Sequence, residues 1–85
     1  MTRPDSTLIE PRFKDAIDLY VRRRQPTGGF LQNVLANDLA GAVALADTQA
    51  LANLPHIMAY IYNDIPGTCW GDPERVRRWL AKEGE

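Results

Sequence analysis

The chain has 85 residues, of which 45% are apolar and 25% are charged, and its formal net charge is −1 at pH 7. This length suits one domain with a modest core, and the composition is that of a chain that is folded over most of its length. The net charge is not the strongly positive one that is typical of a general DNA-binding protein. One cysteine, Cys69, excludes an internal disulfide, and together with one histidine, His56, it leaves too few ligands for a structural zinc site.

The basic residues are confined to the two ends of the chain. All ten Lys and Arg lie in residues 1–24 or in residues 75–85, and residues 25–74 contain none. The small net charge therefore hides a strongly uneven distribution. If the two ends packed together, they would form a local anion-binding surface.

Membrane and export signals are missing from the sequence pattern. The longest uncharged run, residues 48–63, carries several polar residues and a proline, so it is a poor bilayer span. The chain start also lacks a basic segment followed by an apolar signal core. We therefore expect a protein that stays in the cytoplasm and does not contact a membrane.

The first part of the chain predicts an arm followed by a helix. Residues 1–9 are polar and broken by Pro4, which is typical of a flexible arm, and residues 10–85 form the predicted helical domain. A helix should begin at Pro11, because proline suits the first helical position, and should continue to about Arg24. The arginines at 22–24 either complement the helix dipole or contact an anion or a partner. The apolar residues at helical spacing are Phe13, Ala16, Ile17, Tyr20 and Val21.

The stretch around Pro26 predicts a junction between two short helices. Pro26 disfavours helical backbone in the residue before it, and Thr27 is expected to cap the next helix through its hydroxyl. Asn37 and Asp38 should then break the chain and cap a third helix that ends near Ala46. The predicted buried face of the second helix consists of Phe30, Leu31, Val34 and Leu35.

Asp47 is a good N-cap for a longer fourth helix, from Thr48 to about Asn63. Pro55 lies inside this helix, so we expect either a kink near residue 51 or a fresh helix start near residue 53. The predicted apolar face consists of Leu51, Leu54, Met58 and Ile61, with Ile57 alongside.

The last segment predicts a loop and one more helix. Trp70 should fold the loop over the core, and Asp72 followed by Pro73 should open a helix that ends near Lys82. No segment shows the sustained alternation of a strand. The predicted fold class is therefore all-α, a compact single domain of four or five short helices.

Catalytic chemistry has little support in this sequence. Cys69 lies beside Trp70 in a loop that should be packed, where a thiol behaves as a small apolar group. His56 is more typical of a packed helix residue, and the aspartates are scattered singly at predicted caps. We expect no enzymatic activity, no cofactor and no bound metal.

The run Thr27-Gly28-Gly29 at a helix start is either a structural turn or a weak phosphate-binding signal. It lacks the lysine of a P-loop, and it follows a helix where that motif needs a strand. A helix-turn-helix DNA reader is also disfavoured, because the middle helices carry no Lys or Arg to attract phosphates.

The assembled motifs resemble a family of small proteins found mainly in tailed phages and prophages. The resemblance covers about residues 11–80 and depends on the whole string of motifs. Asp72 departs from the family pattern, which more often has Ser, but both residues can cap a helix. The motifs are Pro11-Arg12-Phe13, Pro26-Thr27-Gly28-Gly29-Phe30-Leu31, Val34-Leu35, Asn37-Asp38-Leu39, Ala46-Asp47, Tyr60-Ile61-Tyr62-Asn63, Pro66, Cys69-Trp70-Gly71, Pro73-Glu74, Val76 and Trp79.

This resemblance implies a phage accessory protein that acts by stoichiometric binding, and two classes fit. The first is a counter-defence sponge, a homo-oligomer that sequesters a cyclic nucleotide immune signal in the host cytoplasm. The second is a protein-binding inhibitor of a host defence complex, similar in size to anti-CRISPR proteins, or a structural phage accessory protein.

The sponge hypothesis assigns binding roles to polar and aromatic residues, each of which could instead serve capping, packing or solvation. Backbone amides at a helix start would bind phosphate, arginines would supply charge, aromatic rings would stack on bases, and asparagines would read base edges. The candidates are Thr27, Gly28 and Gly29 for amides, Arg12, Arg77 and Arg78 for charge, Tyr62 and Trp70 for stacking, and Asn33, Asn37 and Asn63 for base edges.

Overall fold

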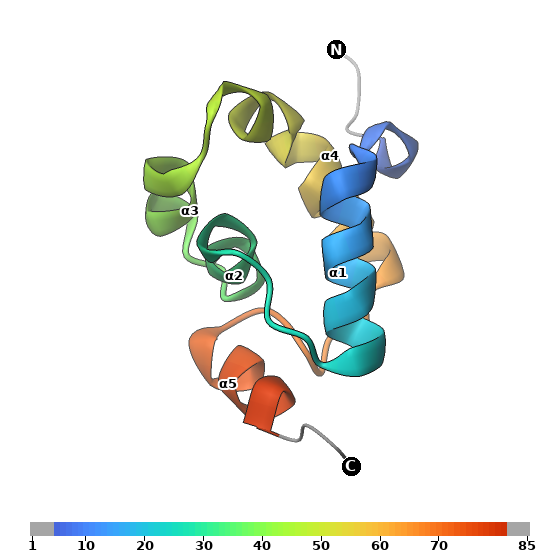
Figure 1. The fold of residues 1–85 in the computed structure, drawn as a ribbon, viewed down its shortest axis with the longest axis vertical. Helices are drawn as coiled ribbons and strands as arrows, with labels where there is room; N and C mark the ends of the chain where they lie inside the picture. The colour runs from blue at the N-terminus through green and yellow to red at the C-terminus, as the bar shows by residue number, and fades with distance from the viewer. Residues whose placement is uncertain (1–4, 82–85) are drawn as a thin grey trace.

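The computed structural model describes residues 5–81, and within these residues it contains helices and no strand. The predicted all-α class is therefore confirmed (Figure 1). Residues 1–4, the start of the predicted arm, and residues 82–85, which include the predicted helix end at Lys82, lie outside the described residues. The elements are η1 (Ser6–Leu8, a 3₁₀ helix), α1 (Pro11–Arg23), α2 (Gly29–Leu35), α3 (Leu39–Leu45), α4 (Thr48–Asp64) and α5 (Pro73–Ala81).

The helices surround one buried core, and two pairs of elements make the closest contacts. The short helices α2 and α3 pack against each other, and η1 packs against α4. Figure 1 shows α1 on the side of η1, away from α3, and α5 beneath α2 at the end where α1 finishes. Each of the five α-helices contributes to the buried core, which consists of Ile9, Phe13, Ile17, Tyr20, Leu31, Val34, Leu35, Ala42, Ala50, Ile57, Ile61, Ile65, Cys69 and Val76.

Helix α1 begins and ends close to the predicted positions. Pro11 occupies the first helical position, and Phe13, Ile17 and Tyr20 are buried along one face. The helix ends at Arg23, and its C-cap residue Arg24 has a left-handed φ of 53° and donates its N–H to the carbonyl oxygens of residues 19 and 20. The chain thus leaves α1 through a left-handed residue, two positions before Pro26.

The start of α2 differs from the prediction. Gly28 is the N-cap and makes no side-chain capping bond, while the hydroxyl of Thr27 donates to the carbonyl oxygen of Gly28 at 3.2 Å. Because α2 begins at Gly29, Thr27 lies one position too early for its hydroxyl to reach the second or third helical amide. The prediction that Thr27 caps α2 is wrong.

Aspartate side chains cap the three helices that follow, as the sequence predicts. Before the first of them, Asn37 turns the chain with a left-handed φ of 63°. In each case a carboxylate oxygen accepts a hydrogen bond from the amide three residues later, which satisfies an otherwise unpaired helical N–H. The pairs are Asp38 with Gly41 (3.0 Å), Asp47 with Ala50 (2.7 Å) and Asp72 with Arg75 (2.8 Å).

Helix α4 is continuous, so Pro55 does not split it. Its predicted apolar face is confirmed at Ile57 and Ile61, which are buried, and at Leu54 and Met58, which pack against the core. The buried face contains Ala50, Asn53, Ile57 and Ile61, whereas 48% of Leu51 is exposed. The placement of Leu51 in the core is therefore wrong. The face of α4 that packs toward η1 and the start of α1 is the one that carries the polar Asn53.

Asn53 holds the segment before α1 against α4. Its Oδ1 accepts from the amide of Glu10 at 2.9 Å, and its Nδ2 donates to the carbonyl oxygen of Leu8 at 3.0 Å. Nearby, the amide of Asp5 donates to Nδ1 of His56 at 3.1 Å, and Ile9 is buried. Residues 5–9 thus contact α4, while the flexibility predicted for residues 1–9 as a whole stays a prediction.

Acidification is expected to destabilise the fold through the cap of α4. The hydrogen bond from the Ala50 amide, with a smaller contribution from Arg12, holds the pKa of Asp47 below its ordinary value. A depressed folded-state pKa gives stability that is present above the unfolded pKa and lost as the pH falls through the folded pKa. The melting temperature, measured by circular dichroism, should therefore drop below about pH 4.

The substitution Asp47→Asn should make that drop shallower, because Asn retains the cap without a titrating group. Asp15→Asn, which changes an exposed aspartate of α1, is the control and should leave the drop unchanged. Equal acid profiles for the wild type and Asp47→Asn would contradict this assignment.

Candidate functional site

The end of α1 and the helix α5 are in direct contact, which joins the two basic ends of the chain. Nε1 of Trp79 on α5 donates to the carbonyl oxygen of Tyr20 on α1 at 2.8 Å. The guanidinium carbon of Arg24 lies 3.9 Å from the centre of the Trp79 ring, in a cation–π contact. The two basic ends of the chain therefore pack together, which is what a local basic surface requires.

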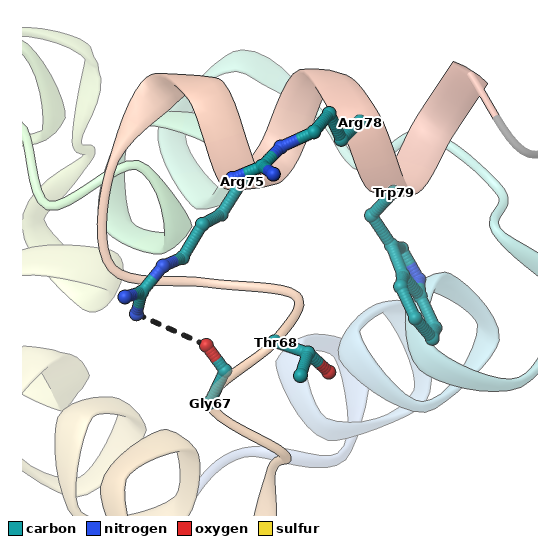
Figure 2. Close-up of a pocket in the computed structure, with 5 residues that line it drawn as sticks. All are labelled: Gly67, Thr68, Arg75, Arg78 and Trp79. Atoms are coloured by element: carbon teal, nitrogen blue, oxygen red, sulfur yellow. Dashed lines mark hydrogen bonds between the residues drawn. The ribbon is translucent and has the colours of Figure 1, made fainter.

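A pocket lies beside this junction, between α5 and the loop before it. Its volume is about 470 Å³, within the range of about 300–1,000 Å³ that is usual for small-molecule sites. Figure 2 shows the long side chains of Arg75 and Arg78 on one side of the pocket, with Thr68 on the loop below them and the ring of Trp79 beyond. The lining residues are Gly67, Thr68, Arg75, Arg78 and Trp79.

The two arginines of the pocket differ in how far they are already engaged. Arg75 donates from Nη1 to the carbonyl oxygen of Gly67 at 3.1 Å, and its Nε lies 3.5 Å from the carboxylate of Asp72, so it ties the loop to α5. Arg78 is looser, because its Nε lies 3.8 Å from Oε1 of Glu74 and 64% of its side chain is exposed. Arg78 is therefore the cation best able to turn toward a ligand.

The loop of residues 66–71 is fixed by hydrogen bonds on its buried side. The Tyr20 hydroxyl donates to the carbonyl oxygen of Cys69 at 2.7 Å, and the amide of Gly71 donates to the carbonyl oxygen of Leu35 at 2.7 Å. Gly71 has a φ of 116°, which favours glycine. These bonds hold the loop, whose residues Gly67 and Thr68 line the pocket, against α1 and α2.

The groups considered for catalysis have structural contacts. The Cys69 thiol donates to the carbonyl oxygen of Pro66 at 3.2 Å, and burial raises the pKa of this thiol. The His56 ring contacts the backbone of Asp5 instead. Among residues 5–81, no group of three His, Cys, Asp or Glu side chains is arranged to hold a metal ion.

The predicted stacking residues Tyr62 and Trp70 form a pair, and neither lines the pocket. Their ring centres are 6.5 Å apart in an edge-to-face arrangement, and 75% of Tyr62 is exposed. Trp70 is partly buried, and its Nε1 has no hydrogen-bond partner within the described residues. Asn63 follows Tyr62 in the last turn of α4 and is exposed.

Two further predicted residues, Asn33 and Arg77, meet in a second groove between α2 and α5, with a volume of about 400 Å³. The guanidinium of Arg77 is engaged by the carboxylate of Glu74. Asn37 lies apart from both, at an apolar groove beside α3.

The remaining candidates lie outside both grooves, and contacts in the structure account for Arg12 and Gly29. Arg12 pairs with Glu10 at 3.3 Å and with Asp47 at 3.5 Å, at the start of α1, the end of that helix far from α5 (Figure 1). A side chain at Gly29 would approach Leu45 to 3.1 Å, so packing accounts for one glycine, while Gly28 has open space and neighbours Thr27 in the same turn.

Of the residues singled out from sequence, only Arg78 lines the basic pocket. Sequence reasoning missed Gly67, Thr68, Arg75 and Trp79 as lining residues. The signal that could have found them is the run of arginines that begins at Arg75 beside Trp79, read together with the turn residues just before it.

Within residues 5–81, no helix combines the length and the hydropathy needed to cross a bilayer. Comparison of the chain with protein-family models, with curated proteins and with solved structures finds no match.

Proposed function

We propose that this protein is a non-enzymatic binder of a small anionic ligand, a cyclic oligonucleotide, in the pocket between α5 and the 66–71 loop. The observation that carries the proposal is the placement of Arg78, exposed and weakly paired, in a concave site with Thr68 and Trp79. A guanidinium can donate two parallel hydrogen bonds to a phosphodiester, and a hydroxyl can donate a third.

The surroundings favour an anion over a neutral ligand. Arg24 covers part of the Trp79 ring at the edge of the site, and Arg75 adds a second cation to the lining. The volume of about 470 Å³ admits part of a cyclic oligonucleotide, with the remainder in solvent or shared with a second copy. Together with the sequence resemblance, this supports sequestration of a nucleotide immune signal in the host cytoplasm by a homo-oligomeric phage protein.

The matched variants Arg78→Ala and Arg77→Ala test the site. Both remove one cation from α5, but only Arg78 lines the pocket. Because a hydrogen bond to a charged group contributes about 1.5–3 kcal/mol, Arg78→Ala should weaken binding about tenfold or more, while Arg77→Ala should change it less than threefold. Isothermal titration calorimetry with a panel of cyclic di- and trinucleotides, and a linear mononucleotide for comparison, measures both.

Absence of heat with every cyclic nucleotide would refute the proposal. Equal weakening by the two variants would mean that the ligand responds to the general charge of α5 and not to this pocket. Native mass spectrometry of the protein purified from its host would report the subunit count and any retained nucleotide.

A second candidate function, a protein-binding inhibitor of a host defence complex, is favoured by a different surface. Side chains of α3 and the start of α4 expose aliphatic groups, and clusters of this kind commonly mark interaction sites. This surface shares no lining residue with the basic pocket, so the two functions are compatible. The exposed fractions are 65% for Leu39, 43% for Val43, 59% for Leu45 and 48% for Leu51.

A further inference from the structure

A mainly aliphatic groove runs between α3 and α4, with the end of α2 at its floor. Its volume is about 240 Å³. Leu39 and Ala42 line it from α3, Leu54 and Met58 line it from α4, and Val34 lies between them on α2. The groove has room for apolar side chains from another molecule.

The walls of the groove suit a helical occupant. Leu39 and Ala42 are three residues apart on α3, and Leu54 and Met58 are four residues apart on α4, so each wall presents a row along its helix axis. An amphipathic helix laid between two such rows would insert its apolar residues at the matching spacing.

The negative charge around the groove favours a partner helix that carries basic residues. Residues 34–58, which include every lining residue, contain two Asp and no Lys or Arg. Asp38 lies at the groove and accepts a hydrogen bond from the amide of Gly41, while Asp47 lies 3.5 Å from Arg12. A two-fold dimer through this face would bring the Asp38 carboxylates of both copies to one interface, and like charges there are unfavourable.

We propose that the groove between α3 and α4 docks an amphipathic helix of a partner protein, with Lys or Arg along the polar edge of that helix. The proposal rests on the second candidate function above and names the chemistry of its partner. It is independent of the basic pocket, because no lining residue is shared.

Selection from a displayed peptide library tests the charge preference directly. The library would fix a Leu stripe at helical spacing and randomise the polar edge among Lys, Glu, Gln and Ser, with the full-length protein as bait. Enriched peptides should carry Lys on the edge at least five times as often as Glu. Enrichment of acidic or neutral edges, or no enrichment, would overturn the proposal.

Variants of the protein test whether the selected peptides bind in the groove. Leu39→Glu puts a charge in the groove at the first residue of α3, where an acidic residue is compatible with the helix, and should weaken binding at least tenfold by fluorescence anisotropy. Leu8→Glu changes a similarly exposed leucine on η1, away from α3 in Figure 1, and should have less than a twofold effect. Asp38→Asn keeps the cap and should weaken binding of Lys-edged peptides several-fold at low salt.

Three outcomes would overturn the assignment. Binding that survives Leu39→Glu, or that falls equally with Leu8→Glu, would place the peptide outside the groove. A dimer in analytical ultracentrifugation that Leu39→Glu converts to monomer would make a second copy of the chain the occupant. The variant Arg78→Ala should weaken nucleotide binding and leave peptide binding unchanged. Failure of one proposal is therefore distinguishable from failure of the other.

Discussion

Asn53→Ala should lower the free energy of unfolding by about 2–4 kcal/mol, because it leaves two backbone groups without partners in a partly buried place. The amide of Glu10 and the carbonyl oxygen of Leu8 both bond to the Asn53 side chain, and only 7% of Asn53 is exposed. Urea unfolding followed by circular dichroism measures the effect. The segment before α1 should also become accessible to proteases in this variant.

Asn63→Ala is the matched control for this experiment. It makes the same chemical change on the same helix at an exposed position, so its effect should stay within about 0.5 kcal/mol. A loss below 0.5 kcal/mol for Asn53→Ala would show that water replaces the side chain at little cost, and the anchoring role would be withdrawn.

Trp79→Ala should destabilise the protein by about 3 kcal/mol, the lower end of the range for removal of a packed Trp side chain. Trp79 is partly buried against the core, donates to the carbonyl oxygen of Tyr20, and lies under the guanidinium of Arg24. Its removal would take away the contacts that join α5 to the end of α1. Thermal and urea unfolding should both register the loss.

Trp79→Phe separates packing from hydrogen bonding at the same position. Phe retains an aromatic ring but leaves the Tyr20 carbonyl oxygen without its donor, so a loss of about 1–2 kcal/mol is expected. Equal losses for the two variants would mean that the hydrogen bond, and not the packing of the ring, holds α5 in place.

The starts of α1, α4 and α5 could be predicted because they depend on local chemistry. Pro11 starts α1, and Asp47 and Asp72 accept hydrogen bonds from amides three residues later, so the chain nearby contains the needed information. The orientation of α4 could not be predicted in this way. Asn53 is buried because the backbone of residues 8 and 10, more than forty positions earlier, bonds to it. Hydropathy favoured Leu51, which is exposed.

The basic pocket could also be predicted only in part from the sequence. The confinement of Lys and Arg to the chain ends predicted a basic surface, and Arg78 was among the candidates. The role of Thr68 as a lining residue depends on how the 66–71 loop folds back onto α5, which the bond from Arg75 to Gly67 helps to fix. Gly28 and Gly29 were predicted to be a weak phosphate-binding signal. Packing accounts for Gly29, because a side chain there would lie 3.1 Å from Leu45.

Pro55 gives the two halves of α4 unequal resistance to local opening. Proline has no amide hydrogen, so the carbonyl oxygen of Leu51 lacks the partner that an uninterrupted helix would provide four residues later. Segments with fewer hydrogen bonds and exposed side chains open at lower free energy than the core. The turn that contains Leu51 should therefore open more readily than the turns around Ile57 and Ile61, and the groove wall that includes Leu54 can adjust its width to an incoming helix without unfolding the domain.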